Sequence, residues 1–178
     1  AETLLAGYGE LRSESQTNAV RAAERDFYKT TLDTLPLEFA LYLRGAVAYR
    51  LGNSEAAVTA WESLLALPAG ERRYRSTWAS FMLGKLRREG DPERAVEHFR
   101  QVRALVQDGF VDSLGLAASS LGWEASAELQ RDHFEQAVGL YVRQLATDDP
   151  TAVWSLRVVA ARVLKDTGLR ERAARDAL

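Results

Sequence analysis

The chain has no cysteine, and its 178 residues include only two histidines, one methionine and four prolines. Without cysteine it forms no disulfide and offers no thiolate to a metal or a substrate, and it fits oxidising and reducing compartments equally. It also lacks an excess of either charge, because 23 lysines and arginines face 25 aspartates and glutamates that are interleaved with them. A net charge of −2 argues against general attraction to nucleic acid or to anionic membranes.

Long apolar runs are absent as well. No stretch is long enough to cross a bilayer, so we expect no direct membrane insertion, and no secretory signal pattern is present. The 47% hydrophobic and 27% charged residues are typical of a soluble globular domain. The chain begins at Ala1 instead of methionine, which either a cleaved leader or a larger parent protein explains. An alanine- and arginine-rich composition favours a bacterial source, with cytoplasm and periplasm both open.

What the sequence does contain is one pentamer in three versions. AVTAW begins at Ala57, AVEHF at Ala95 and AVGLY at Ala137, so the intervals are 38 and 42 residues. A small, a branched and an aromatic residue recur at fixed offsets, and a period of this length is typical of stacked helical hairpins. The repeat predicts an elongated stack and argues against an enclosed enzyme pocket.

Prolines and capping residues predict where the helices begin and end. Asp91-Pro92 and Asp149-Pro150 each combine an N-cap acceptor with a proline at the first helical position, and Pro68 closes the helix before it. No alternating strand pattern occurs. The predicted helices span residues 18–32, 37–51, 54–67, 72–89, 92–107, 112–130, 132–147, 150–166 and 169–178.

We therefore expect an all-α fold, an alpha–alpha superhelix of about four helical hairpins plus an N-terminal helix. Residues 1–17 are expected to form a flexible or loosely docked lead-in, and residues 18–178 a single helical-repeat domain. The last predicted helix stops in mid-pattern at Leu178, so either its charged residues cap the stack or the protein continues. The hairpins are predicted at about 37–67, 72–107, 112–147 and 150–178.

The first predicted hairpin contains five residues whose types and order match a known repeat signature: Gly45, Gly52, Ala57, Trp61 and Pro68. This order resembles the tetratricopeptide repeat, a helix pair of about 34 residues with the signature W-x2-L-G-x2-Y, A-x3-F and P. In that family the small residue lets the paired helix approach and a glycine permits the tight turn between helices. The resemblance covers about residues 37–178 and implies a TPR-like solenoid whose units are degenerate and longer than standard.

The later units keep part of this order. The residues that fit are Gly90, Ala95 and Phe99 in the second unit, with Leu83 or Gly84 at the small-residue place, then Ala125, Ala137, Tyr141 and Pro150 in the third, and Gly168 and Ala173 in the fourth. The resemblance implies a scaffold for protein–protein interactions.

No residue pattern points to catalysis, and we expect no enzyme activity, no cofactor and no metal. His98 and His133 lie beside Phe99 and Phe134, and without H-E-x-x-H, cysteine or an aspartate-rich loop they are expected on helix surfaces and not as metal ligands. Neither a glycine-rich phosphate loop nor Gly-x-Ser-x-Gly occurs.

One basic cluster stands out, and it is too small to predict a nucleic-acid interface. Arg72, Arg73 and Arg75 are expected to pair with Glu71 or with neighbouring acids. The four tryptophans are expected in the core rather than as stacking platforms; they are Trp61, Trp78, Trp123 and Trp154.

In such stacks the first helix of each hairpin lines the concave face. With Gly45 at the small-residue place, the residues that project inward are Phe39, Tyr42, Ala46, Tyr49 and Arg50, then Thr77, Ser80, Arg87 and Arg88, then Ser119, Gly122, Ser126 and Gln130, then Val158, Arg162 and Lys165. Arginine suits carboxylates because of its fixed fork of donors, and tyrosine adds rigid contact area with a polar tip. The candidate peptide-groove residues are Tyr42, Tyr49, Arg50, Arg87, Arg88, Arg162 and Lys165.

The predicted function is a non-catalytic scaffold that binds a partner protein or a peptide, with acidic groups on the ligand, in the concave groove. An alternative of equal weight is that these arginines pair with acids on neighbouring helices and bind no ligand. A second interpretation is a structural or substrate-presenting domain of a larger bacterial cell-envelope enzyme or assembly. A third is self-association through an uncapped end.

Overall fold

The computed structural model describes residues 32, 34–147, 151–168 and 171. This part of the chain contains seven α-helices, one short 3-10 helix and no strand. The elements are α2 (Leu37–Arg50), α3 (Ser54–Leu65), η1 (Ala69–Glu71), α4 (Ser76–Arg87), α5 (Pro92–Gln107), α6 (Leu116–Gln130), α7 (Phe134–Leu145) and α8 (Thr151–Lys165). The predicted lead-in, most of the predicted helices at 18–32 and 169–178, and the Asp149-Pro150 boundary lie outside the described residues.

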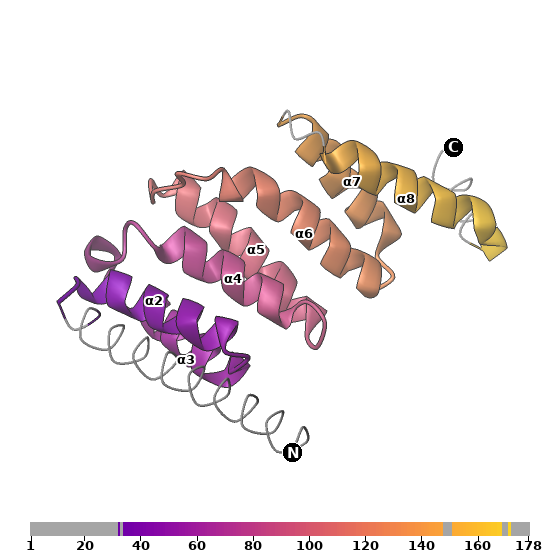
Figure 1. The fold of residues 1–178 in the computed structure, drawn as a ribbon. Helices are drawn as coiled ribbons and strands as arrows, with labels where there is room; N and C mark the ends of the chain where they lie inside the picture. Colours follow the sequence, from indigo (N-terminus) through magenta and orange to yellow (C-terminus); the bar gives the residue numbers. More distant parts are fainter. Residues whose placement is uncertain (1–31, 33, 148–150, 169–170, 172–178) are drawn as a thin grey trace, which may run out of the picture.

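The all-α prediction is confirmed, and the helices form successive hairpins. Consecutive helices pack against each other, and α4 also contacts α6. Figure 1 shows the pairs α2/α3, α4/α5 and α6/α7 following one another along the molecule, with α8 after α7. In this view α2, α4, α6 and α8 lie side by side across the front of the molecule, and we call the surface that they form the first-helix face.

Two helices begin where they were expected, and a side chain caps each of them. The side chain of Asn53 accepts a hydrogen bond from the backbone N–H of Ala56 at 3.1 Å, at the start of α3. Asp91 does the same for Arg94 at 3.1 Å, and Pro92 opens α5 as expected. Each cap satisfies an N–H group that the first helical turn leaves without a partner.

The predicted starts of α4 and α6 were wrong by four residues each. α4 begins at Ser76 and not at residue 72, because the backbone N–H groups of Tyr74 and Arg75 donate to the carboxylate of Glu38, at 3.0 and 3.2 Å. Glu38 belongs to α2, so this contact is invisible in the local sequence. α6 begins at Leu116 because Asp112 stands before the helix and caps it from outside.

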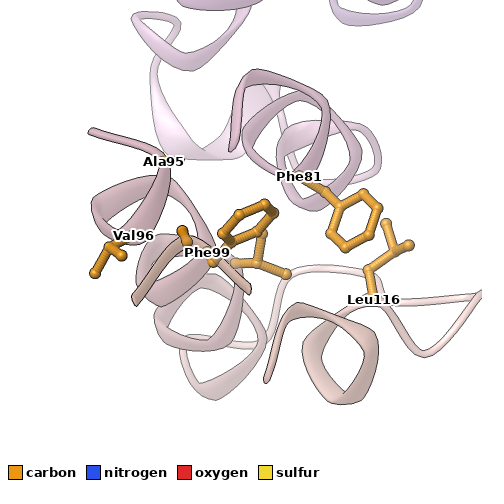
Figure 2. Packing of buried hydrophobic residues seen from close by; sticks show 7 residues of the cluster. Phe81, Ala95, Val96, Phe99 and Leu116 are labelled. Atoms are coloured by element: carbon orange, nitrogen blue, oxygen red, sulfur yellow. The ribbon is translucent and has the colours of Figure 1, made fainter. Parts of the chain in front are cut away.

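Three clusters of buried side chains form the core, and each combines one hairpin with the next first helix. Trp61, Phe99 and Tyr141, the aromatic residues of the three pentamers, lie in separate clusters beside the alanine that opens the same pentamer. All three are buried. Figure 2 shows the middle cluster, where the Phe81 and Phe99 rings lie between the helices with Leu116 nearby. The pentamers thus mark equivalent contacts between successive hairpins.

The small-residue place of the second hairpin is Gly84. A Cβ atom on Gly84 would lie 2.6 Å from Cε1 of Phe99, and a Cβ on Gly45 would collide with the ring of Trp61 in the same way. Leu83, the alternative, is buried in the first cluster with Trp61. Because one residue turns an α-helix by about 100°, this assignment rotates the expected inner face of α4 by one position.

Candidate functional site

With Gly84 at the small-residue place, the inner face of α4 is shifted by one residue from the predicted one, and the predicted inward residues lie elsewhere. Thr77 and Ser80, predicted to project inward, are fully buried. The Thr77 hydroxyl donates to the carbonyl of Val111 at 2.8 Å, and the Ser80 hydroxyl donates to the carbonyl of His98 at 2.9 Å. Both side chains therefore face the rest of the stack, and neither lies on the first-helix face.

Arg87 and Arg88 are neighbours in sequence, and they face opposite neighbours in space. Arg87 forms an ion pair with Glu62 on α3, with 3.6 Å between Nη2 and Oε1. The Arg88 guanidinium instead turns towards α6, where Nη1 lies 3.4 Å from the hydroxyl of Ser126, and its Nη2 pairs with the exposed carboxylate of the adjacent Glu89 at 3.3 Å. Arg88 lies on the first-helix face, whereas Arg87 is held by an acid of the preceding hairpin, which is the alternative that the sequence left open.

Arg88 lines a pocket of about 400 Å³ between first helices. Small residues of α6 form part of its lining. The lining residues are Arg88, Ser119, Gly122, Trp123, Ser126, Tyr141, Gln144, Thr151 and Ser155. The pocket thus combines one guanidinium, several hydroxyl groups and the aromatic rings of Trp123 and Tyr141. We call it the Arg88 pocket.

Two cations flank the Trp123 ring of this pocket. The ammonium of Lys85 lies 4.8 Å from the centroid of the Trp123 ring, and the guanidinium carbon of Arg88 lies 5.0 Å from it. The ring also stacks on Phe99, with 6.4 Å between centroids. Cation–π contacts hold both side chains near the pocket. Lys85 was not among the predicted groove residues. It would have been selected with Gly84 at the small-residue place, because the position directly after that residue projects inward.

Tyr141 supplies a neutral hydroxyl to the pocket. Burial raises the pKa of its phenol, while the hydroxyl of Ser155 and the charge of Arg88 pull that pKa down. Gln144 donates from Nε2 to the hydroxyl of Thr151 at 3.1 Å, which ties α7 to α8 beside the pocket. The pocket wall therefore presents polar, uncharged groups around a single positive one, an arrangement that suits a ligand with one carboxylate.

The α2 end of the first-helix face is aromatic. Tyr42 is half-buried, and burial raises the pKa of its phenol while the charge of Arg75 lowers it. Its ring meets Trp78 edge-on at 5.6 Å. Tyr49 is exposed and leans on Trp61 with 6.0 Å between centroids, and Arg50 is exposed at the end of α2. The structure therefore places Tyr42 beside α4 and Tyr49 beside α3.

Arg75 was expected to pair with an acid, and in the described residues it does not. Its guanidinium carbon lies 5.0 Å from the Phe39 centroid, 5.5 Å from Tyr42 and 5.0 Å from Trp78. Arg72 also departs from the prediction, since it donates to the Leu67 carbonyl at 2.9 Å. The local sequence does not reveal these contacts, because two of the three rings come from α2.

The α8 end of the face is more open. Lys165 lies on a hollow of about 770 Å³ whose described lining is confined to residues 158–167. The side chain of Arg162 lies outside the described part of the chain. Trp154, expected in the core, is 69% exposed, which corrects that prediction. Lys165 and Arg88 thus line different hollows.

A network of buried charges on α5 and α6 was not predicted from the sequence. Glu124 and Glu128 on α6 are 2% and 1% exposed. Arg100 on α5 binds both carboxylates, at 2.8 and 3.2 Å, and Arg103 pairs with Glu124. Arg131 binds Glu128 at 3.0 Å. The pairs of Arg100 and Arg103 join the second hairpin to the third, so they position α6 and its share of the pocket.

The histidines belong to this supporting structure. His133 Nδ1 lies 2.7 Å from Oε2 of Glu128, and His98 Nδ1 lies 3.4 Å from the side-chain oxygen of Gln101. Burial is the main cause that lowers the pKa of His98. In the part of the chain that the structure describes, no three histidine, cysteine or acidic side chains gather as a metal site would require. Nor does any helix among these residues have the length and apolarity needed to cross a membrane.

Comparison with known protein families supports the hairpin assignment. The family model of the tetratricopeptide repeat matches residues 39–67 and residues 78–106. The first match covers most of α2 and all of α3, and the second covers most of α4 and α5. A search of curated proteins gives no match.

Proposed function

We propose that this chain, in which residues 39–67 and 78–106 match the tetratricopeptide repeat, is a non-catalytic scaffold that binds a partner protein through a peptide lying across its first-helix face. Tetratricopeptide repeats generally mediate protein–protein interactions. The observation that carries the proposal is the Arg88 pocket, in which one guanidinium lies among hydroxyl groups and aromatic rings.

The chemistry of the pocket favours an acidic group on the peptide. A guanidinium binds a carboxylate through parallel hydrogen bonds, and hydroxyl groups add further donors. The cation–π contact with Trp123 keeps the Arg88 side chain in place, so little side-chain entropy is lost on binding. Lys85 adds a second positive charge nearby, which steers acidic ligands by long-range attraction.

Paired substitutions in adjacent residues test the proposal. Peptides that bind the chain are first selected from a random displayed library, and their affinities are then measured by titration calorimetry. We expect selected peptides to be rich in aspartate and glutamate, and we expect Arg88→Ala to weaken binding about tenfold, the effect of one lost charged hydrogen bond.

Arg87→Ala is the matched control, since it removes the same side chain one position away, where it pairs with Glu62. Its affinity for the peptides is expected to stay within about twofold of the unaltered chain, a difference below about 0.5 kcal/mol. Equal losses in the two variants, or no loss in Arg88→Ala, would contradict the proposal.

A further inference from the structure

A second cation on the first-helix face is held in an unusual way. The guanidinium of Arg75 lies among the rings of Phe39 and Tyr42 from α2 and of Trp78 from α4. All three centroids are between 5.0 and 5.5 Å from its central carbon. The rings come from two successive hairpins, so the fold itself restricts this side chain.

No ion pair joins Arg75 to an acid anywhere in the described residues, in contrast to the arginines of the buried network. The acid with the most direct link to Arg75 is Glu38, and its Oε2 accepts the backbone N–H groups of Tyr74 and Arg75. The charge of the guanidinium is thus balanced by ring faces and not by a carboxylate that binds its fork.

The free edge of the fork can be located from its nitrogen atoms. Nε is buried and has no hydrogen-bond partner in the described structure, which places it against the rings. The two terminal nitrogens are not among the buried atoms without partners, and no hydrogen bond occupies them within the same residues. Each terminal nitrogen therefore keeps some exposed surface, while the three rings pack against the guanidinium.

We propose that Arg75 is an anchor for a carboxylate of the partner peptide, at the seam between α2 and α4. A restrained guanidinium with two open terminal nitrogens matches the two oxygens of a carboxylate, and the rings remove most of the entropy cost of holding it there. A lysine in the same place would offer charge without the planar fork.

The anchor deepens the proposed function, on which its biological role rests, and it sets a spacing. Arg75 and Arg88 flank the two ends of α4, so about 20 Å separates them along the helix axis. An extended peptide needs about six residues to cover that distance. A peptide that uses both sites therefore carries two carboxylates at least about six residues apart.

The anchor is tested first without any peptide. The protein, labelled with nitrogen-15, is titrated with sodium acetate and, separately, with sodium chloride at equal ionic strength, while the Nε–H signal of Arg75 and the indole N–H signal of Trp78 are recorded. We expect saturable shifts with acetate that chloride does not reproduce. Identical shifts with both salts would overturn the proposal, because they would report screening alone.

Three variants assign the effect to the fork. With Arg75→Gln the acetate-dependent shift of the Trp78 signal is expected to vanish, and with Arg75→Lys the acetate affinity is expected to fall at least threefold although the charge remains. Arg94→Gln is the control, because Arg94 is exposed and pairs with Asp91. A melting temperature within a few degrees of the unaltered chain checks that each variant folds. An unchanged response in Arg75→Gln would overturn the proposal.

Two peptides then identify the source of the carboxylate. One is a ten-residue peptide with a single glutamate and an amidated C-terminus, and the other has alanine at that place and a free C-terminal carboxylate. Binding that depends on Arg75 by either peptide supports the anchor, and binding by neither overturns it. The proposed function fails separately, if selected peptides bind without any dependence on Arg88.

Discussion

Single glycines set how closely the helices of this molecule approach. Gly84 lies where a side chain would enter the ring of Phe99, and Gly45 holds the same relation to Trp61. Gly139, in the middle of α7, has no atom within 4 Å of the place where its Cβ would be. The two kinds of glycine look alike in sequence, and only the aromatic residue of the facing helix distinguishes them.

Alanine substitutions at Gly84 and Gly139 should therefore have opposite effects. We expect Gly84→Ala to lower the free energy of unfolding by about 1–3 kcal/mol, because the added methyl group forces Phe99 out of a close-packed place. Gly139→Ala should raise it by about 0.5–1 kcal/mol, since alanine is the better helix former and nothing obstructs it. Urea unfolding followed by circular dichroism measures both, and a stabilised Gly84→Ala variant would contradict the packing described here.

At the scale of the element, the sequence predicts helices well where their ends are capped locally. Asn53 and Asp91 lie directly before the helices that they cap, so α3 and α5 begin where expected. The residues just before α4 are held by Glu38 from another helix, and no local pattern contains that information. The same reason explains the rotated inner face of α4, because choosing between Leu83 and Gly84 requires the position of Phe99.

The seam between α5 and α6 depends on acids that resemble solvated ones in the sequence. Glu124 and Glu128 are four residues apart on α6, a spacing that is usual on exposed helix faces. Their burial follows from Arg100 and Arg103, which α5 presents to them. The candidate groove could be predicted only in part for a similar reason. Arg88 was among the candidates, whereas the three rings around Arg75 and the place of Lys85 depend on contacts between hairpins.

Removing one carboxylate of the buried network between α5 and α6 should lower the free energy of unfolding strongly. Glu124→Gln leaves Arg103 partly buried without its carboxylate, so we expect the free energy of unfolding to fall by about 3–5 kcal/mol. Arg94→Ala breaks an exposed pair with Asp91 and should cost less than about 1 kcal/mol. Urea unfolding at neutral pH measures both losses. Similar small losses in the two variants would mean that the buried network contributes no more than a surface ion pair.

At the scale of the whole molecule, one contact is repeated with different side chains. Trp61, Phe99 and Tyr141 each fill the space between a hairpin and the next first helix. The repeat of the pentamer was sufficient to predict this layering, although the intervals between its copies differ. The repetition leaves the first helices side by side, so the proposed extended partner would meet one continuous face.

A competing surface lies on the opposite layer. α7 carries three exposed apolar side chains at helical spacing, Val138, Val142 and Leu145. Exposed apolar stripes of this kind also serve as contact surfaces. The two surfaces lie on different helices, so a bound partner can be assigned to one of them by mapping.

The most direct measurement of the central claim is a map of backbone and side-chain chemical shifts on adding a library-selected peptide to the nitrogen-15-labelled chain. The account predicts that the largest changes fall on α4, α6 and α8 around Arg88, Trp123 and Ser126, and that they disappear with Arg88→Ala. Changes concentrated on Val138, Val142 and Leu145 of α7, with the first helices unaffected, would contradict it.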